Sequence, residues 1–145
     1  MNWQENILTA DSQIADLLRE TKRIAVLGIK PESHASQPAF YVSKYMQQAG
    51  FDITPVPVYY PEVTEILGQK VYRDLRDVPG EIDMINVFRR DTDIMKHVDE
   101  IIETKPKSVW FQLGIRNDVA AEAFARAGIK VVQNLCLMVE HRALV

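Results

Sequence analysis

The sequence of 145 residues has a single cysteine, Cys136, and only three histidines. One cysteine excludes an intrachain disulfide and a zinc site made of clustered cysteines. The histidines His34, His97 and His141 are too far apart for a local metal-binding motif, so no metal ion is expected. The fold must therefore rest on its apolar core, and a chain of this length can bury roughly 68–70% of its unfolded surface.

Long apolar runs and positive charge are also missing. No apolar run approaches the roughly 18 residues of a membrane span, and the first residues lack the basic start and apolar centre of a signal peptide. We therefore expect a cytoplasmic protein without membrane contact. The net charge is −3, and no basic run provides the surface that nucleic-acid binding requires. An anionic small molecule would need a local pocket.

Glycine is scarce at the point where a dinucleotide-binding protein needs it. An apolar run at 24–27 ends in Gly28, and a polar loop then leads into a helical pattern that begins near Pro38. This order is typical of a nucleotide-binding unit, in which backbone N–H groups and a helix start face a phosphate. The next glycine is Gly50, so the G-x-G-x-x-G fingerprint is absent and standard NAD binding is not expected.

Short apolar strands alternate with helical patterns along the rest of the chain. Strands are predicted at 23–27, 52–56, 83–88, 108–111 and 130–132, and helices at about 11–20, 38–49, 92–103 and 117–127. Such alternation indicates an α/β fold with a parallel sheet covered on both faces. We predict one Rossmann-like, doubly wound domain over residues 1–145, with its five strands in the order 3-2-1-4-5.

Ligands of such sheets bind beyond the carboxyl ends of the strands. An NAD-binding protein has an acidic residue after the second strand to hold the ribose, whereas this chain has Pro57 and Val58. An apolar shelf there suits an adenine ring and a substituted ribose better than a free 2′-hydroxyl.

Two arginines, Arg89 and Arg90, follow the third strand. The planar fork of at least one can pair with phosphate oxygens. Alternatively, both are surface charges that pair with Asp91 and Asp93. Neighbouring residues at a strand end point to opposite sides, so only one arginine is expected to face the crevice.

Several segments together resemble the small stand-alone coenzyme A-binding proteins, which are similar to the N-terminal domain of the succinyl-CoA synthetase alpha subunit. Besides the loop at 28–38, they are PVP at 55–57, LGQKVY at 67–72, DMINVFRR at 83–90, VWFQLGI at 109–115 and CLMVEH at 136–141. Their order and spacing match over nearly the whole chain, from about residue 23 to 141.

The resemblance implies a Rossmann-like domain that holds coenzyme A or an acyl-CoA. It places the pyrophosphate over the loop at 28–37 and the helix start, and the adenine near Pro57, Val58 and Phe88. The residues expected at the cofactor are Gly28, Ile29, Lys30, Ser36, Gln37, Pro38, Pro57, Val58, Phe88, Arg89, Arg90, Gln112, Leu113, Gly114 and Cys136.

The chain departs from the family pattern at two places. Family members often carry Asn-Pro-Lys after the second strand, where this chain has Pro57, Val58 and Tyr59, so a lysine contact to phosphate is not carried over. They often carry Asp-Arg before the cysteine, where this chain has Asn134 and Leu135.

No catalytic residue is identified. His34 is expected in a loop and His97 on a solvent-exposed helix face. Cys136 is the one potential nucleophile, because a helix start favours its thiolate, but it can equally be a buried packing residue.

We therefore expect a coenzyme A-binding module without identified catalysis, acting as a carrier, sensor or regulator whose protein partner is unknown. Two alternatives stay open. One is an NAD or adenine-nucleotide sensor that uses the same crevice. The other is an enzyme that acts on a CoA thioester together with a partner.

Overall fold

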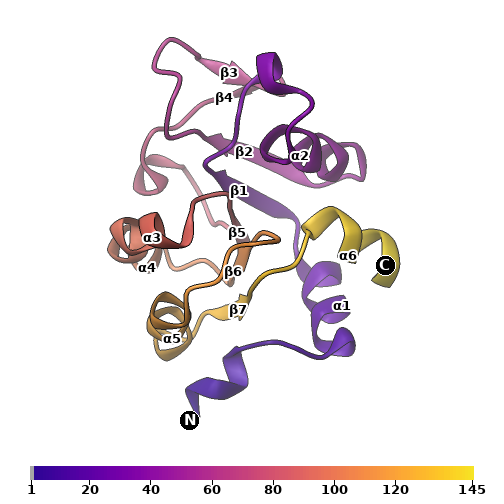
Figure 1. The fold of residues 1–145 in the computed structure, drawn as a ribbon, viewed down its shortest axis with the longest axis vertical. Coiled ribbons are helices and arrows are strands. Elements are labelled where there is room, and N and C mark those ends of the chain that lie inside the picture. Colours follow the sequence, from indigo (N-terminus) through magenta and orange to yellow (C-terminus); the bar gives the residue numbers. More distant parts are fainter. Residues whose placement is uncertain (1) are drawn as a thin grey trace.

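The computed structural model describes residues 2–145 and has a five-stranded parallel sheet between two layers of helices (Figure 1). Every strand pair in this sheet is parallel. The predicted α/β, Rossmann-like fold is confirmed. The strands of the sheet are β1 (Arg23–Leu27), β2 (Asp52–Val56), β5 (Met84–Val87), β6 (Ser108–Phe111) and β7 (Lys130–Val132).

Each face of the sheet is covered by helices and has its own apolar core. The helices α1 (Asp11–Glu20), α2 (Pro38–Gln48) and α6 (Leu137–Leu144) pack on one face, where Val26 and Trp110 are buried (Figure 1). The helices α3 (Asp91–Ile94), α4 (Val98–Thr104) and α5 (Asp118–Arg126) lie on the other face, over Val87 and Phe111. Neighbouring residues of a strand, such as Trp110 and Phe111, face opposite cores because side chains alternate between the two faces of a sheet.

The strands lie in the order β2-β1-β5-β6-β7, which is 2-1-3-4-5 in the numbering of the predicted strands. This differs from the predicted 3-2-1-4-5, because the third strand lies beside the first and not outside the second. Pro55 of β2 explains the difference. Proline has no N–H to donate, so it belongs on an edge strand. β5, buried at all four positions, takes the central place between β1 and β6.

The segment between β2 and β5 runs along the free edge of β2. It contains a hairpin of β3 (Glu65–Ile66) and β4 (Gln69–Lys70), which is not among the predicted strands. Leu67 and Gly68 form its turn with φ of 55° and 73°, as a two-residue hairpin loop of type I′ requires. The N–H of Tyr72 then donates to the carbonyl of Pro55 at 3.0 Å, so this carbonyl on the edge strand has a hydrogen-bond partner.

The helix predicted at 92–103 is broken. The structure divides it into α3, a 3-10 turn η4 (Met95–His97) and α4. Three further 3-10 turns are η1 (Trp3–Asn6), η2 (Glu32–His34) and η3 (Leu75–Asp77). Between residues 2 and 145, no helix has the length and apolar character needed to cross a bilayer.

Candidate functional site

A cavity of about 410 Å³ opens at the carboxyl edge of the sheet, where β1, β5 and β6 end. The chain leaves β1 for β2 on one side and later returns to β5 on the other side. The gap between β1 and β5 is therefore the switch point of the sheet, where open parallel sheets bind their ligands.

Eight of the predicted site residues line this cavity. They come from the loops after β1, β5 and β6 and from the start of α2, and they are Gly28, Lys30, Gln37, Pro38, Phe88, Arg89, Arg90 and Gly114. Three lining residues were not predicted: Ala39, Asp91 and Ile115. Each directly follows a predicted residue in the chain and belongs to the same loop or helix start.

The other seven predicted residues are outside the cavity lining. Ile29, Pro57 and Gln112 are buried, Val58 and Cys136 are half-buried, and Ser36 and Leu113 are exposed. Val58 packs against the core under α4 and α5, so the expected shelf at 57–58 does not reach the cavity. Cys136 is the N-cap residue of α6 and packs against the opposite core.

Gln112 has a structural role in the sheet. Its Oε1 accepts hydrogen bonds from Nδ2 of Asn86 and from the N–H of Leu137, both at 3.3 Å. These bonds connect β5, β6 and the first turn of α6. The polar side chain at the end of the fourth strand is therefore used inside the protein.

Gly28 allows β1 and β5 to approach each other at the mouth of the cavity. It has a φ of +89°, and a Cβ atom at this position would lie 2.4 Å from the carbonyl oxygen of Phe88. The N–H of Gly28 donates to the carbonyl of Val56 at 2.9 Å, so the loop is tied to β2 as well. Only glycine fits both the positive φ and the close contact.

The start of α2 presents its first turn to the cavity. Gln37 is the N-cap residue and makes no side-chain capping hydrogen bond, while Pro38 takes the first helical position. The Oε1 of Gln37 instead accepts from Nζ of Lys30, which places this ammonium group beside the helix start. N–H groups at a helix start, together with a nearby cation, form a binding site for an anion.

Arg89 and Arg90 differ in their partners. Nε of Arg90 donates to the carboxylate of Asp93 at 3.0 Å, and its side chain is 79% exposed. Hydrogen bonds from Lys96 and Arg90 lower the pKa of Asp93 below its usual value. The charge of Arg90 is therefore compensated by a carboxylate, as the surface-charge alternative predicts for this residue.

Arg89 pairs with neither Asp91 nor Asp93. Its Nε donates to Nε2 of His97 at 3.1 Å, and its guanidinium carbon lies 5.8 Å from the centre of the Tyr59 ring. A cation at this distance from an aromatic ring is attracted to it. Among residues 2–145, the guanidinium of Arg89 consequently has no carboxylate in direct contact.

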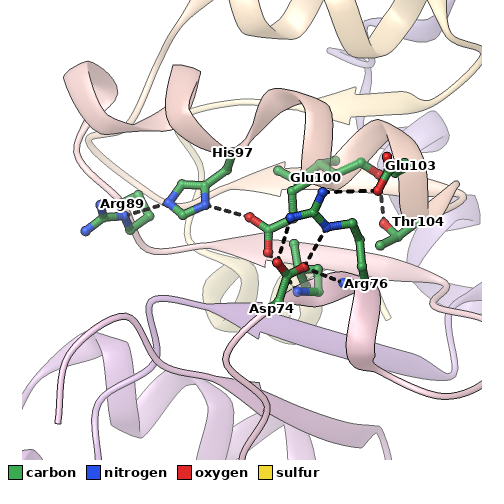
Figure 2. Close-up of polar contacts among 9 residues, drawn as sticks. Asp74, Arg76, Arg89, His97, Glu100, Glu103 and Thr104 are labelled. Carbon is green, nitrogen blue, oxygen red and sulfur yellow. Dashed lines mark hydrogen bonds and ion pairs between the residues drawn. The ribbon is translucent and has the colours of Figure 1, made fainter. Parts of the chain in front are cut away.

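His97 is not the exposed residue that the sequence suggests. Its side chain is 15% exposed, and its Nδ1 lies 2.9 Å from Oε1 of Glu100. Figure 2 shows Arg89, His97 and Glu100 in a row, with the imidazole between the guanidinium and the carboxylate. The break between α3 and α4 places His97 at this point.

The cavity lining is electropositive although the chain as a whole is acidic. Lys30, Arg89 and Arg90 contribute three positive charges, and Asp91 contributes one negative charge. The net charge of the chain is −3. A positive cavity with a helix start and a glycine-containing loop can hold phosphate groups.

This chain is similar to a known domain family and to a bacterial protein. A family model described as a CoA binding domain matches residues 22–142. The uncharacterized protein YneT of Bacillus subtilis is 35% identical over 130 residues, covering 90% of this chain and 93% of YneT.

Solved structures with the same fold include two of similar length. A Thermus thermophilus protein has a TM-score of 0.86 at 35% identity, covering 94% of this chain and 100% of its own. A hypothetical protein from Pyrococcus horikoshii has a TM-score of 0.84 at 33% identity, covering 94% of this chain and 92% of its own. With a family model that spans most of its length, this chain belongs to the CoA-binding domain family.

Proposed function

We propose that this protein binds coenzyme A, or an acyl-CoA, in the cavity at the ends of β1, β5 and β6. The charge of the cavity is the observation that carries the proposal. Lys30 and Arg89 line it, and within residues 2–145 neither forms an ion pair with a carboxylate, although the net charge of the chain is −3. Coenzyme A has a pyrophosphate and a 3′-phosphate, and this concentration of positive charge provides partners for both.

The parts of the cavity suit different parts of the ligand. The pyrophosphate lies against the Gly28 loop and the first turn of α2, beside the ammonium group of Lys30 and the N–H of Ala39. Arg89 offers a planar donor fork to a further phosphate oxygen. A cavity of about 410 Å³ is within the usual range for small-molecule sites, and its wide mouth lets a long ligand continue over the surface.

Family membership and the end of β2 favour coenzyme A over NAD. The residues after β2 are the buried Pro57 and the half-buried Val58, and no carboxylate is present there to hold a free ribose. The histidines His34 and His141 and the thiol of Cys136 are outside the cavity lining. We therefore propose a carrier, sensor or regulator role in preference to catalysis.

Thermal unfolding with added ligand tests this proposal. Coenzyme A at about 100 times its dissociation constant should stabilise the protein by about 2.7 kcal/mol and raise the melting temperature by roughly 5–10 °C. NAD at the same concentration should produce a much smaller rise, because it lacks the 3′-phosphate and its ribose finds no acidic partner. A larger shift with NAD than with coenzyme A would support the nucleotide-sensor alternative and refute this proposal.

A further inference from the structure

Arg89 is held through Nε, and its two terminal nitrogens, Nη1 and Nη2, take no part in this contact. Nε is occupied by Nε2 of His97 at 3.1 Å, and the ring of Tyr59 lies against the guanidinium. Within residues 2–145, Nη1 and Nη2 of Arg89 form no hydrogen bond and no ion pair. Since Arg89 lines the cavity, its terminal donors are available to an anionic ligand there.

The protonation of His97 follows from its partners. Arginine stays protonated in proteins and can only donate, so Nε2 of His97 must be the acceptor. The imidazole is then neutral with its proton on Nδ1, which donates to Oε1 of Glu100 at 2.9 Å. A neutral imidazole fixes the guanidinium without neutralising it, whereas Asp93 neutralises Arg90.

Glu100 is itself fixed on both oxygens. Its second oxygen, Oε2, accepts from the N–H of Leu75 in η3 at 2.7 Å, and its side chain is 13% exposed. η3 is tied to α4 by Arg76, which pairs with Asp74 at 2.7 Å and with Glu103 at 3.3 Å (Figure 2). The hydrogen bond from Arg76 lowers the pKa of Asp74 to about 2, so this pair is ionised over the working pH range.

We propose that His97 and Glu100 are positioning residues that orient Arg89 for the phosphates of the ligand, an inference that rests on the proposed coenzyme A function. The row Glu100, His97 and Arg89 connects the first turn of α4 to the cavity. A free arginine side chain carries about 2 kcal/mol of rotamer entropy. Holding its Nε before the ligand arrives removes part of that cost from binding.

Two amide variants of His97 separate positioning from general stability. In His97→Gln the amide reaches the place of Nε2 and its oxygen can accept from Arg89, whereas in His97→Asn it reaches only the place of Nδ1. We expect His97→Asn to weaken coenzyme A binding about tenfold, equivalent to about 1.4 kcal/mol, and His97→Gln to weaken it less than about threefold. Equal losses in both variants would contradict the proposal.

A double-mutant cycle measured by calorimetry shows whether His97 acts through Arg89. In the Arg89→Ala background, His97→Asn should cause no further loss of affinity, because the group that it positions is gone. A full additional tenfold loss in that background would show that His97 affects binding in another way.

Nitrogen NMR of the ligand-free protein tests the arrangement without relying on binding. The imidazole of His97 should show a protonated Nδ1 and an unprotonated Nε2 at neutral pH, and the Nε–H signal of Arg89 should shift in His97→Asn but not in His97→Gln. An Nε2-protonated ring would overturn the inference. Failure of the wild-type protein to bind coenzyme A would refute the proposed function. The NMR result would still show whether His97 accepts the hydrogen bond from Arg89.

Discussion

Gly28→Ala will destabilise the protein by about 2–6 kcal/mol, the sum of a strained positive φ and an overpacked contact. The new Cβ would lie 2.4 Å from the carbonyl oxygen of Phe88, and neither backbone can move away without separating the ends of β1 and β5. The mouth of the cavity lies between these ends. We therefore also expect at least a tenfold loss of coenzyme A affinity, or about 1.4 kcal/mol.

Gly128→Ala is the matched control for this change. Gly128 has nearly the same φ, +84°, but a Cβ there would meet no atom within 4 Å. The control therefore includes the backbone strain and leaves out the overlap. Chemical denaturation of both variants, with calorimetry of coenzyme A binding, makes the comparison. If Gly128→Ala is as unstable as Gly28→Ala, the close approach of the two strands is not what requires glycine at position 28.

Arg89→Ala should lose coenzyme A affinity by about 1.5–3 kcal/mol, the range for a hydrogen bond to a charged group. Arg89 lines the cavity, and in the described part of the chain its charge has no carboxylate partner and its terminal donors form no hydrogen bond. Arg90→Ala should stay close to wild type, because its charge is already paired with Asp93 and its side chain extends into solvent. Truncating Arg90 therefore removes mainly a surface ion pair, which contributes little.

Each variant replaces one arginine by alanine, and the two positions are adjacent in the chain. The nonspecific effect of one lost positive charge on ligand binding is therefore nearly equal in both. Titration calorimetry at two salt concentrations measures the difference. If the loss occurs in Arg90→Ala and not in Arg89→Ala, the assignment of the phosphate contact is reversed. If both variants bind like wild type, no arginine after β5 contacts the ligand.

The positions of the strands could be predicted from the sequence because each is a short apolar run between helical patterns. Their order could not be derived from these runs, since pairing depends on contacts between distant segments. One relevant signal was present. Pro55 lies inside β2 and lacks the N–H that a central strand needs, which indicates an edge strand and therefore a third strand beside β1.

The loops that form the cavity were predictable for a similar local reason, as the carboxyl ends of parallel strands share one edge of the sheet. The difference between Arg89 and Arg90 was not predictable. It depends on the partner of each side chain, and the partner of Arg89 is His97, eight residues away beyond a break in the helix. A regular helix at 92–103 would place His97 on an exposed face. No local sequence pattern predicts the 3-10 turn at Met95–His97 that interrupts this helix.

The central claim is that coenzyme A binds at the ends of β1, β5 and β6, and backbone amide NMR tests it most directly. During titration with coenzyme A, the amide signals of Gly28, Ala39, Phe88 and Gly114 should move together and saturate at one equivalent of ligand, because these residues line the cavity. A second cavity of about 490 Å³ between η1 and α5, lined by Trp3, Ile7 and Gln133, is the internal control and its signals should stay in place. Signals that move only around this second cavity, or no movement at all, would contradict the account.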